Sequence, residues 1–157
     1  MRILNIHRRT ISRPRENLAQ LLETLATKDD KWWPWEQWPA MRFKKGKTPG
    51  AVGGHGPVRY SIERIEPGQS IEFKFLQPAG FNGVHRFELL ELENENTEII
   101  HTIEMNVSGT GVLTWIFAIR WLHDALLEDC LDKIENQFSE KKTTTPWNVW
   151  VRILRSV

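Results

Sequence analysis

The stretch GVLTWIFAIRWLHDALLEDCLDKIENQFS, residues 111–139, decides the fold because it predicts one long helix near the C-terminus. At about 100° per residue, its apolar side chains fall on one broad face. That face holds Val112, Ile116, Ile119, His123, Leu126, Cys130, Ile134 and Phe138, with Trp115 at its edge. Four acidic residues fall opposite: Asp124, Glu128, Asp132 and Glu135. A helix divided in this way needs a surface to cover its apolar face.

The chain before this helix predicts that surface, an antiparallel sheet. Apolar and polar residues alternate in 58–62, 71–75, 85–89 and 99–107, which is typical of half-buried strands. The turns at 67–68 and 93–96 are too short for crossover helices, so neighbouring strands pair as hairpins. A further strand is expected at 3–11. A sheet with one apolar face is covered on that face, and the long helix is the expected cover.

Four other segments lie outside this pattern. Ser12 opens a short helix in which Pro14 takes an early position, followed by leucines at helical spacing. The Trp-rich segment, KWWPWEQWP at 31–39, predicts a short helix or turn between two prolines. Residues 46–57, GKTPGAVGGHGP, predict a loop because glycine and proline dominate them. The tail after Pro146 predicts a short apolar run that docks on the body or mediates self-association.

Composition narrows the class of protein. A length of 157 residues predicts one domain spanning 1–157. Twenty-one basic against twenty acidic residues leave no charge excess that would favour nucleic acid or an acidic membrane. The single cysteine, Cys130, excludes an internal disulfide and fits a reducing compartment. With no leader-like apolar segment and no apolar run of membrane length, we expect a cytoplasmic protein without a membrane span.

The order of these elements resembles the START-like superfamily, also called SRPBCC or birch-pollen-allergen-like. The stretches that carry the resemblance are GPVRYSIERIEPGQSIEFKF (56–75), GFNGVHRFELLELENENTEIIHTIEM (80–105) and FAIRWLHDALLEDCLDKIE (117–135). The resemblance implies an α+β helix-grip fold, in which a curved antiparallel sheet wraps around a long C-terminal helix. Short helices follow the first strand, and a cavity separates sheet from helix. The superfamily contains polyketide cyclases, lipid-transfer domains and hormone-binding proteins, and it implies no cofactor for this chain.

Residues on the inner face are therefore the expected ligand contacts. They are Tyr60, Phe73, Phe75, His85, Phe87, His101, Ile103, Met105, Trp115, Ile119 and His123. If their strands are neighbours under the helix, His85, His101 and His123 converge. Three roles are open for them. They are core histidines whose hydrogen bonds are satisfied by the protein, or groups that contact a ligand or act as acid and base, with His85 and His101 as the catalytic candidates. A three-histidine metal site is the least favoured role. No metal site is expected.

Three functions stay open at this point. The first is binding, or transport, of a hydrophobic small molecule or lipid in the cavity. The second is a polyketide cyclase or dehydratase type of enzyme that uses a cavity histidine to move a proton. The third is an interaction module with a filled core, for which the Trp-rich segment or the tail would be the interface. The expected partners are a hydrophobic small molecule and, as an open alternative, a second copy of the chain.

Overall fold

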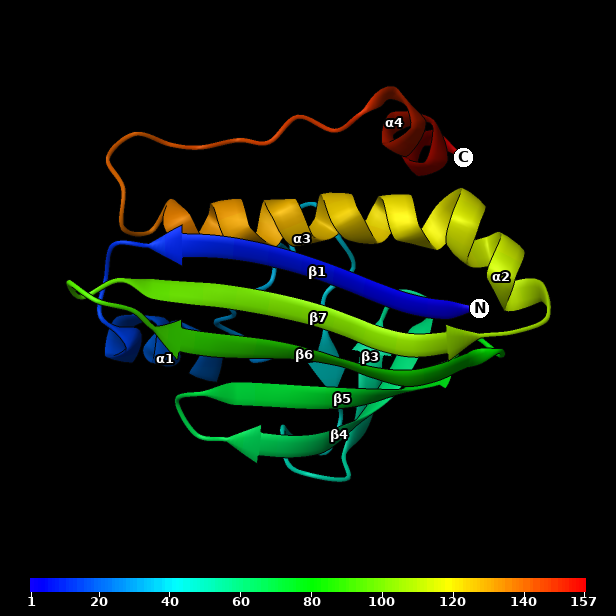
Figure 1. The fold of residues 1–157 in the computed structure, drawn as a ribbon, viewed down its shortest axis with the longest axis horizontal. Coiled ribbons are helices and arrows are strands. Elements are labelled where there is room, and N and C mark those ends of the chain that lie inside the picture. Colours follow the sequence, from blue (N-terminus) through cyan, green and yellow to red (C-terminus); the bar gives the residue numbers. More distant parts are fainter.

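A single seven-stranded antiparallel sheet forms one layer of the molecule (Figure 1). The computed structural model describes residues 1–157. The strands lie in the order β1-β7-β6-β5-β4-β3-β2, so that the first strand pairs with the last one. Their bounds are β1 (Arg2–Ile11), β2 (Arg42–Phe43), β3 (Val52–His55), β4 (Val58–Glu66), β5 (Ser70–Gln77), β6 (Phe81–Glu91) and β7 (Thr97–Val107).

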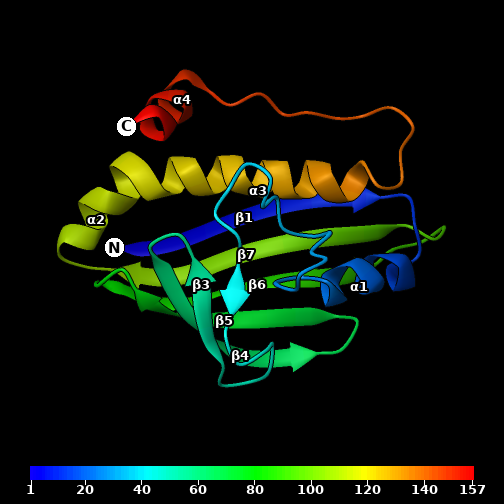
Figure 2. The same cartoon turned by 180° about the vertical axis from the view of Figure 1, so that it is seen from behind.

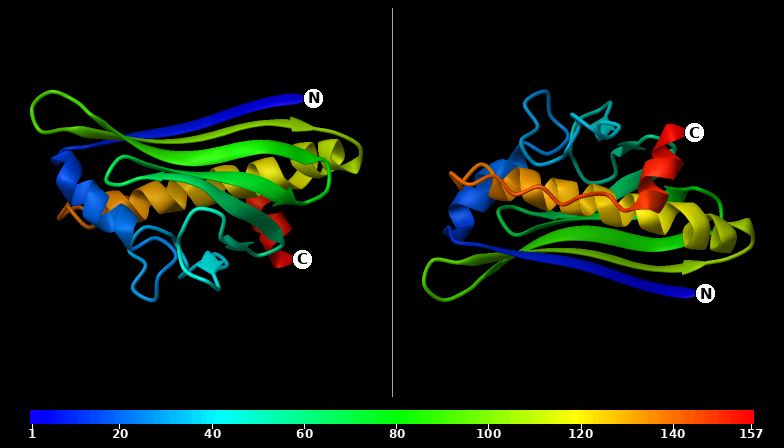
Figure 3. Two further views of the ribbon diagram at one scale, coloured as in Figure 1. Left: turned by 90° about the horizontal axis from the view of Figure 1, so that it is seen from below. Right: turned by 90° about the horizontal axis from the view of Figure 1, so that it is seen from above.

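The long C-terminal helix and the short helix after β1 form the second layer, against the inner face of the sheet, and the last helix packs on the long one (Figures 2 and 3). The long C-terminal helix consists of α2 (Thr110–Thr114), a π-helical turn (Trp115–Ile119) and α3 (Arg120–Glu135). The short helix α1 (Arg15–Glu23) follows β1, and α4 (Val149–Ser156) ends the chain. This arrangement confirms the expected helix-grip fold. No helix is both long and apolar enough to cross a membrane.

The π-helical turn explains one departure from the expected helix face. Ile116 is 41% exposed, whereas Trp115 beside it is 4% exposed and lies in the core. A π turn carries one more residue than an α turn and so shifts the faces on either side of it relative to each other. The single periodicity predicted across 111–139 therefore fails at this point. It fails again in α3, where Asp129 and Asp132 are buried, so the acidic side of the helix is not turned wholly to solvent.

The glycine-rich stretch 46–57 is not wholly a loop, contrary to the sequence prediction, because β3 lies within it. Gly53 pairs with Phe43 of β2 and with Tyr60 of β4. A Cβ atom at Gly53 would collide with the carbonyl oxygen of Arg42, so glycine is needed here for close backbone approach rather than for flexibility. The helix expected from Ser12 also begins later, at Arg15.

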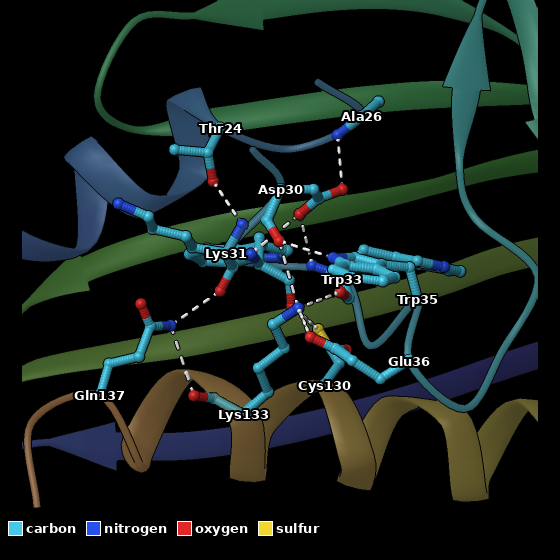
Figure 4. A network of polar contacts seen from close by, with 11 residues as sticks. Thr24, Ala26, Asp30, Lys31, Trp33, Trp35, Glu36, Cys130, Lys133 and Gln137 are labelled. Carbon is cyan, nitrogen blue, oxygen red and sulfur yellow. Dashed lines mark hydrogen bonds and ion pairs between the residues drawn. The ribbon is translucent and has the colours of Figure 1, made fainter. Parts of the chain in front are cut away.

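A buried carboxylate holds the Trp-rich segment against the body (Figure 4). Asp30 Oδ1 accepts hydrogen bonds from the backbone N–H groups of Trp32 and Trp33, at 2.9 and 2.7 Å. Its Oδ2 accepts from the N–H of Ala26 at 2.8 Å. From α3, Lys133 Nζ donates to the carbonyl oxygens of Asp30 and Trp33. These bonds fix the indoles that reach the cavity described next.

Candidate functional site: a histidine-lined cavity

A cavity of about 220 Å³ lies between the sheet and the long helix. Most of its wall is apolar. Side chains from β5, β6 and β7 form one side, and the π-helical turn and α3 form the other. The β3–β4 turn, the Trp-rich segment and the end of α4 surround the remainder. The cavity therefore lies where the helix-grip fold places one.

Seven of the eleven expected ligand contacts line this cavity: Phe75, His85, His101, Ile103, Trp115, Ile119 and His123. The other four, Tyr60, Phe73, Phe87 and Met105, are buried in the packed core beside it and do not form its wall. Their rings and the thioether fill space between the sheet and the segments that cover it. Whether any of the eleven contacts a ligand stays a prediction.

Several wall residues were not among the expected contacts. Trp33 and Trp38 come from the Trp-rich segment, and Leu154 and Arg155 come from the tail. His55 also lies on the wall, because β3 carries it inward from within the glycine-rich stretch 46–57. The clustering of tryptophans was the one sequence signal for part of this wall. Nothing in the periodicity of the tail indicated that it would reach the cavity.

All five histidines of the chain lie in one row across the core. Ring centroids are 5.8 Å apart for His7 and His123, 5.1 Å for His123 and His101, and 5.6 Å for His101 and His85. Tyr60 continues the row, 4.7 Å from His85, and its hydroxyl lies 3.0 Å from His55 Nδ1. The three histidines expected to converge are thus consecutive members of this row.

The cavity histidines are neutral at physiological pH. Burial lowers the pKa of His85 and His101 well below the ordinary value of 6.5 and lowers that of His55 to about 3. Burial also lowers the pKa of His123. A neutral imidazole offers one donor and one acceptor. The wall therefore presents hydrogen-bonding groups without charge.

These histidines are not fully satisfied by the protein. His101 Nε2 lies 3.4 Å from His85 Nδ1, a long contact in which one ring donates and the other accepts. His85 Nε2 and His101 Nδ1 are buried and have no partner. An unpaired buried polar atom costs roughly 1–3 kcal/mol. The unpaired nitrogens belong to rings on the cavity wall, where a ligand could supply partners.

Helix α4 borders one side of the cavity, where Leu154 and Arg155 line it. Val151 of this helix is buried, and Trp147 just before it donates from Nε1 to Asp129 Oδ2 at 2.8 Å. The guanidinium of Arg155 lies 4.2 Å from the ring centre of Trp38, an indole of the wall. The tail therefore docks on the body, one of the two outcomes left open by its sequence.

Comparison with known proteins agrees with this geometry. No protein-family model and no curated protein matches the sequence. A norcoclaurine synthase mutant from Thalictrum flavum, solved with a transition-state analogue, has a TM-score of 0.64 at 10% identity, covering 88% of this chain and 98% of that one. The chain has the START-like fold. The expected resemblance is thus confirmed at the level of the fold.

Two further solved structures of this fold are similar. A START superfamily protein from Mycobacterium smegmatis has a TM-score of 0.57 at 12% identity, covering 85% of this chain and 95% of that one. The di-domain ARO/CYC protein StfQ, from the steffimycin biosynthetic pathway, has a TM-score of 0.60 at 14% identity. That alignment covers 87% of this chain and 50% of StfQ, which carries two domains.

Proposed function

We propose that the protein binds a compact hydrophobic molecule that carries at least one hydrogen-bonding group. The observation that carries this proposal is the pair of unpaired nitrogens, His85 Nε2 and His101 Nδ1, on rings that line an otherwise apolar cavity. A ligand hydroxyl or carbonyl oxygen would pair with them, and the apolar wall would take up the rest of the molecule. The START-like fold of a ligand-enclosing helix grip is consistent with this function.

The volume favours a small ring system over a long acyl chain. An engineered apolar cavity of about 150 Å³ binds benzene. The cavity here, at about 220 Å³, is half as large again and scales to two fused aromatic rings. Phe75, Trp115 and Trp33 provide aromatic surface around it. A phenolic two-ring molecule such as 2-naphthol is therefore a suitable probe.

The test is calorimetric titration of the protein with 2-naphthol, after native mass spectrometry has shown whether a molecule co-purifies. We expect one molecule bound per chain. Ile103→Trp, which fills the cavity from β7, should weaken binding at least tenfold. Leu113→Trp adds the same indole at a site that is 60% exposed and outside the cavity, and it should bind as the native chain does. Equal binding by both variants would refute the cavity as the site.

A second candidate function is acid/base catalysis of a cyclisation. The observation that favours it is the contact of two neutral imidazoles, His85 and His101, at 3.4 Å on the cavity wall. One ring can take a proton from a substrate carbon while the other donates to its carbonyl oxygen. The test is mass spectrometry of a poly-β-ketone thioester after incubation. His85→Gln and His101→Gln should abolish loss of water from the substrate without lowering the melting temperature, and His55→Gln should not.

Self-association and cellular location belong to the same proposal. The exposed apolar side chains Phe117 and Trp150, which are joined by a hydrogen bond from Trp150 Nε1 to the Phe117 carbonyl, offer a surface for a second copy of the chain. Phe117→Asp should then halve the mass measured by light scattering. Cys130 is buried and forms no disulfide, which fits a cytoplasmic location, where cysteines stay reduced.

A further inference from the structure

The inner face of β1 carries a polar stripe, although the inner faces of its neighbours are mostly apolar. Asn5, His7 and Arg9 alternate along β1 and face the acidic side of α3. Arg9 pairs with Glu128, Asp132 and Glu135. Asn5 Nδ2 donates to Asp124 Oδ1 at 2.9 Å. Strand and helix are thus joined by polar groups beside the cavity.

Three potential metal ligands converge within this stripe. His7 Nε2 lies 3.0 Å from Asp124 Oδ1, and His123 Nδ1 lies 3.8 Å from the same oxygen. The ligand atoms of these three residues all lie within 4.8 Å of one another. Tetrahedral zinc with bonds of about 2.0–2.1 Å holds its ligand atoms roughly 3.3 Å apart. The His7–Asp124 separation of 3.0 Å is shorter than this value, the His123–Asp124 separation of 3.8 Å is longer, and all three atoms lie within 4.8 Å of one another, so the His123 ring must move inward when an ion binds.

The surroundings of His7 match those of a metal-bound histidine. Its second nitrogen, Nδ1, lies 2.9 Å from Glu128 Oε1, and Glu128 in turn accepts from Arg9 at 3.0 Å. A carboxylate that accepts from Nδ1–H fixes the ring, so that a metal ion would replace the proton that Nε2 shares with Asp124 Oδ1 at 3.0 Å. Metal-ligating histidines almost always have such a partner. His7 therefore faces the ligand Asp124 through Nε2 and the supporting carboxylate of Glu128 through Nδ1.

Charge and hydrogen bonding leave room for a cation. Four carboxylates lie around the three ligands and pair with two guanidinium groups, those of Arg9 and Arg120. When His7 is neutral, two negative charges are therefore uncompensated. The carboxylates are those of Asp124, Glu128, Asp132 and Glu135. His123 Nδ1 is buried and has no hydrogen-bond partner, since 3.8 Å is too long for one. A dication would satisfy both conditions.

We propose that His7, His123 and Asp124 bind a divalent transition metal ion, with zinc as the best fit. Two imidazoles and one carboxylate form a ligand set that suits zinc and other late first-row ions and leaves at least one coordination position open. The Asp124 side chain is 33% exposed, which gives the ion access from solvent. Glu128 is a positioning residue that acts through His7. The site is separate from the apolar cavity and shares only His123 with it.

The test uses the full-length chain without an affinity tag, freed of metal by dialysis against a chelator. Cobalt(II) serves as a spectroscopic probe and zinc as a calorimetric one. We expect one ion per chain, with the visible absorption of tetrahedral or five-coordinate cobalt. His7→Gln and Asp124→Asn should lose the spectrum. Glu128→Gln should weaken zinc binding by roughly 10–100-fold, as expected for loss of a supporting carboxylate.

His85→Gln is the matched control because His85 is a buried histidine outside the three ligands. It should bind cobalt as the native chain does. Circular dichroism checks that each variant is folded. The Asp124 side chain is 33% exposed and that of His7 11%, so Asp124→Asn decides the outcome if His7→Gln unfolds. No saturable binding by the native chain would overturn the proposal, as would binding that survives in Asp124→Asn. In either case the cluster is an ion pair of protonated His7 with two carboxylates.

Discussion

Replacing Asp30 with alanine tests whether one buried carboxylate holds the Trp-rich wall of the cavity. Asp30 is 4% exposed and accepts three backbone N–H groups, from Ala26, Trp32 and Trp33. Asp30→Ala leaves these donors without acceptors. A hydrogen bond to a charged group contributes about 1.5 kcal/mol at the lower end, so three such bonds predict a loss of about 4.5 kcal/mol in the free energy of unfolding. That is a large share of the stability of a typical domain.

Urea unfolding followed by tryptophan fluorescence measures this loss, since ΔG falls linearly with denaturant. The neighbouring Asp29→Ala is the matched control. The Asp29 side chain is 83% exposed and makes one surface ion pair, with Lys31 at 3.5 Å, so its removal should change ΔG by less than about 0.5 kcal/mol. Asp30→Asn should lose an intermediate amount, because its amide oxygen still accepts from Trp32 and Trp33. If Asp30→Ala loses no more than Asp29→Ala, the carboxylate does not anchor the segment.

Three further predictions follow from other parts of the chain. The pKa of His55 is about 3 in the folded protein, against an ordinary value of 6.5. Below pH 6.5 the unfolded chain therefore binds a proton that the folded chain does not bind, so the free energy of unfolding falls as the pH falls. Between about pH 7.5 and 5.0 the loss of stability due to His55 amounts to about 2 kcal/mol. His55→Gln should remove this amount from the pH dependence of ΔG measured by urea unfolding. An unchanged pH dependence would contradict the lowered pKa of His55. Gly83→Ala should cost about 2 kcal/mol in urea, because a Cβ there meets the backbone of β7, whereas Asn82→Ala on the exposed side should be close to neutral. Deleting residues 147–157 should open the cavity and raise the fluorescence of a naphthalene-sulfonate dye, and Val149→Ala, at a 67% exposed position, should not.

The sheet and the long helix were predictable because each repeats a simple pattern. Apolar residues alternate through β4, β5, β6 and β7, and every register in the sheet is antiparallel as the short turns required. Seven expected contacts reach the cavity for the same reason, since alternation fixes which side chains face inward. Tyr60 and Phe73 share that face but are covered by Phe43 of β2, which pairs with β3, the strand that the glycines concealed.

The polar cluster at His7 was not predicted, because the acidic side of the helix was expected to lie opposite the face that the sheet covers. Asn5, His7 and Arg9 lie on the same face of β1 as the buried Ile3 and Ile11. The acidic residues Asp124, Glu128 and Asp132 recur at intervals of four along the helix. A basic and polar stripe on one element and an acidic stripe on another is a complementary pair that the sequence contains. Only the pairing of β1 with β7 shows that they meet.

The attachment of α4 has a consequence for how such a chain can change over time. The tail reaches the cavity through an irregular segment, residues 136–148, that belongs to no strand or helix, and it is held at Asp129 and by Arg155 over Trp38. The sheet has all its strand pairs without it. Substitutions in these final residues can therefore reshape that side of the cavity while the scaffold stays intact. The border of the cavity at α4 and the strand pairing of the sheet thus depend on different parts of the chain.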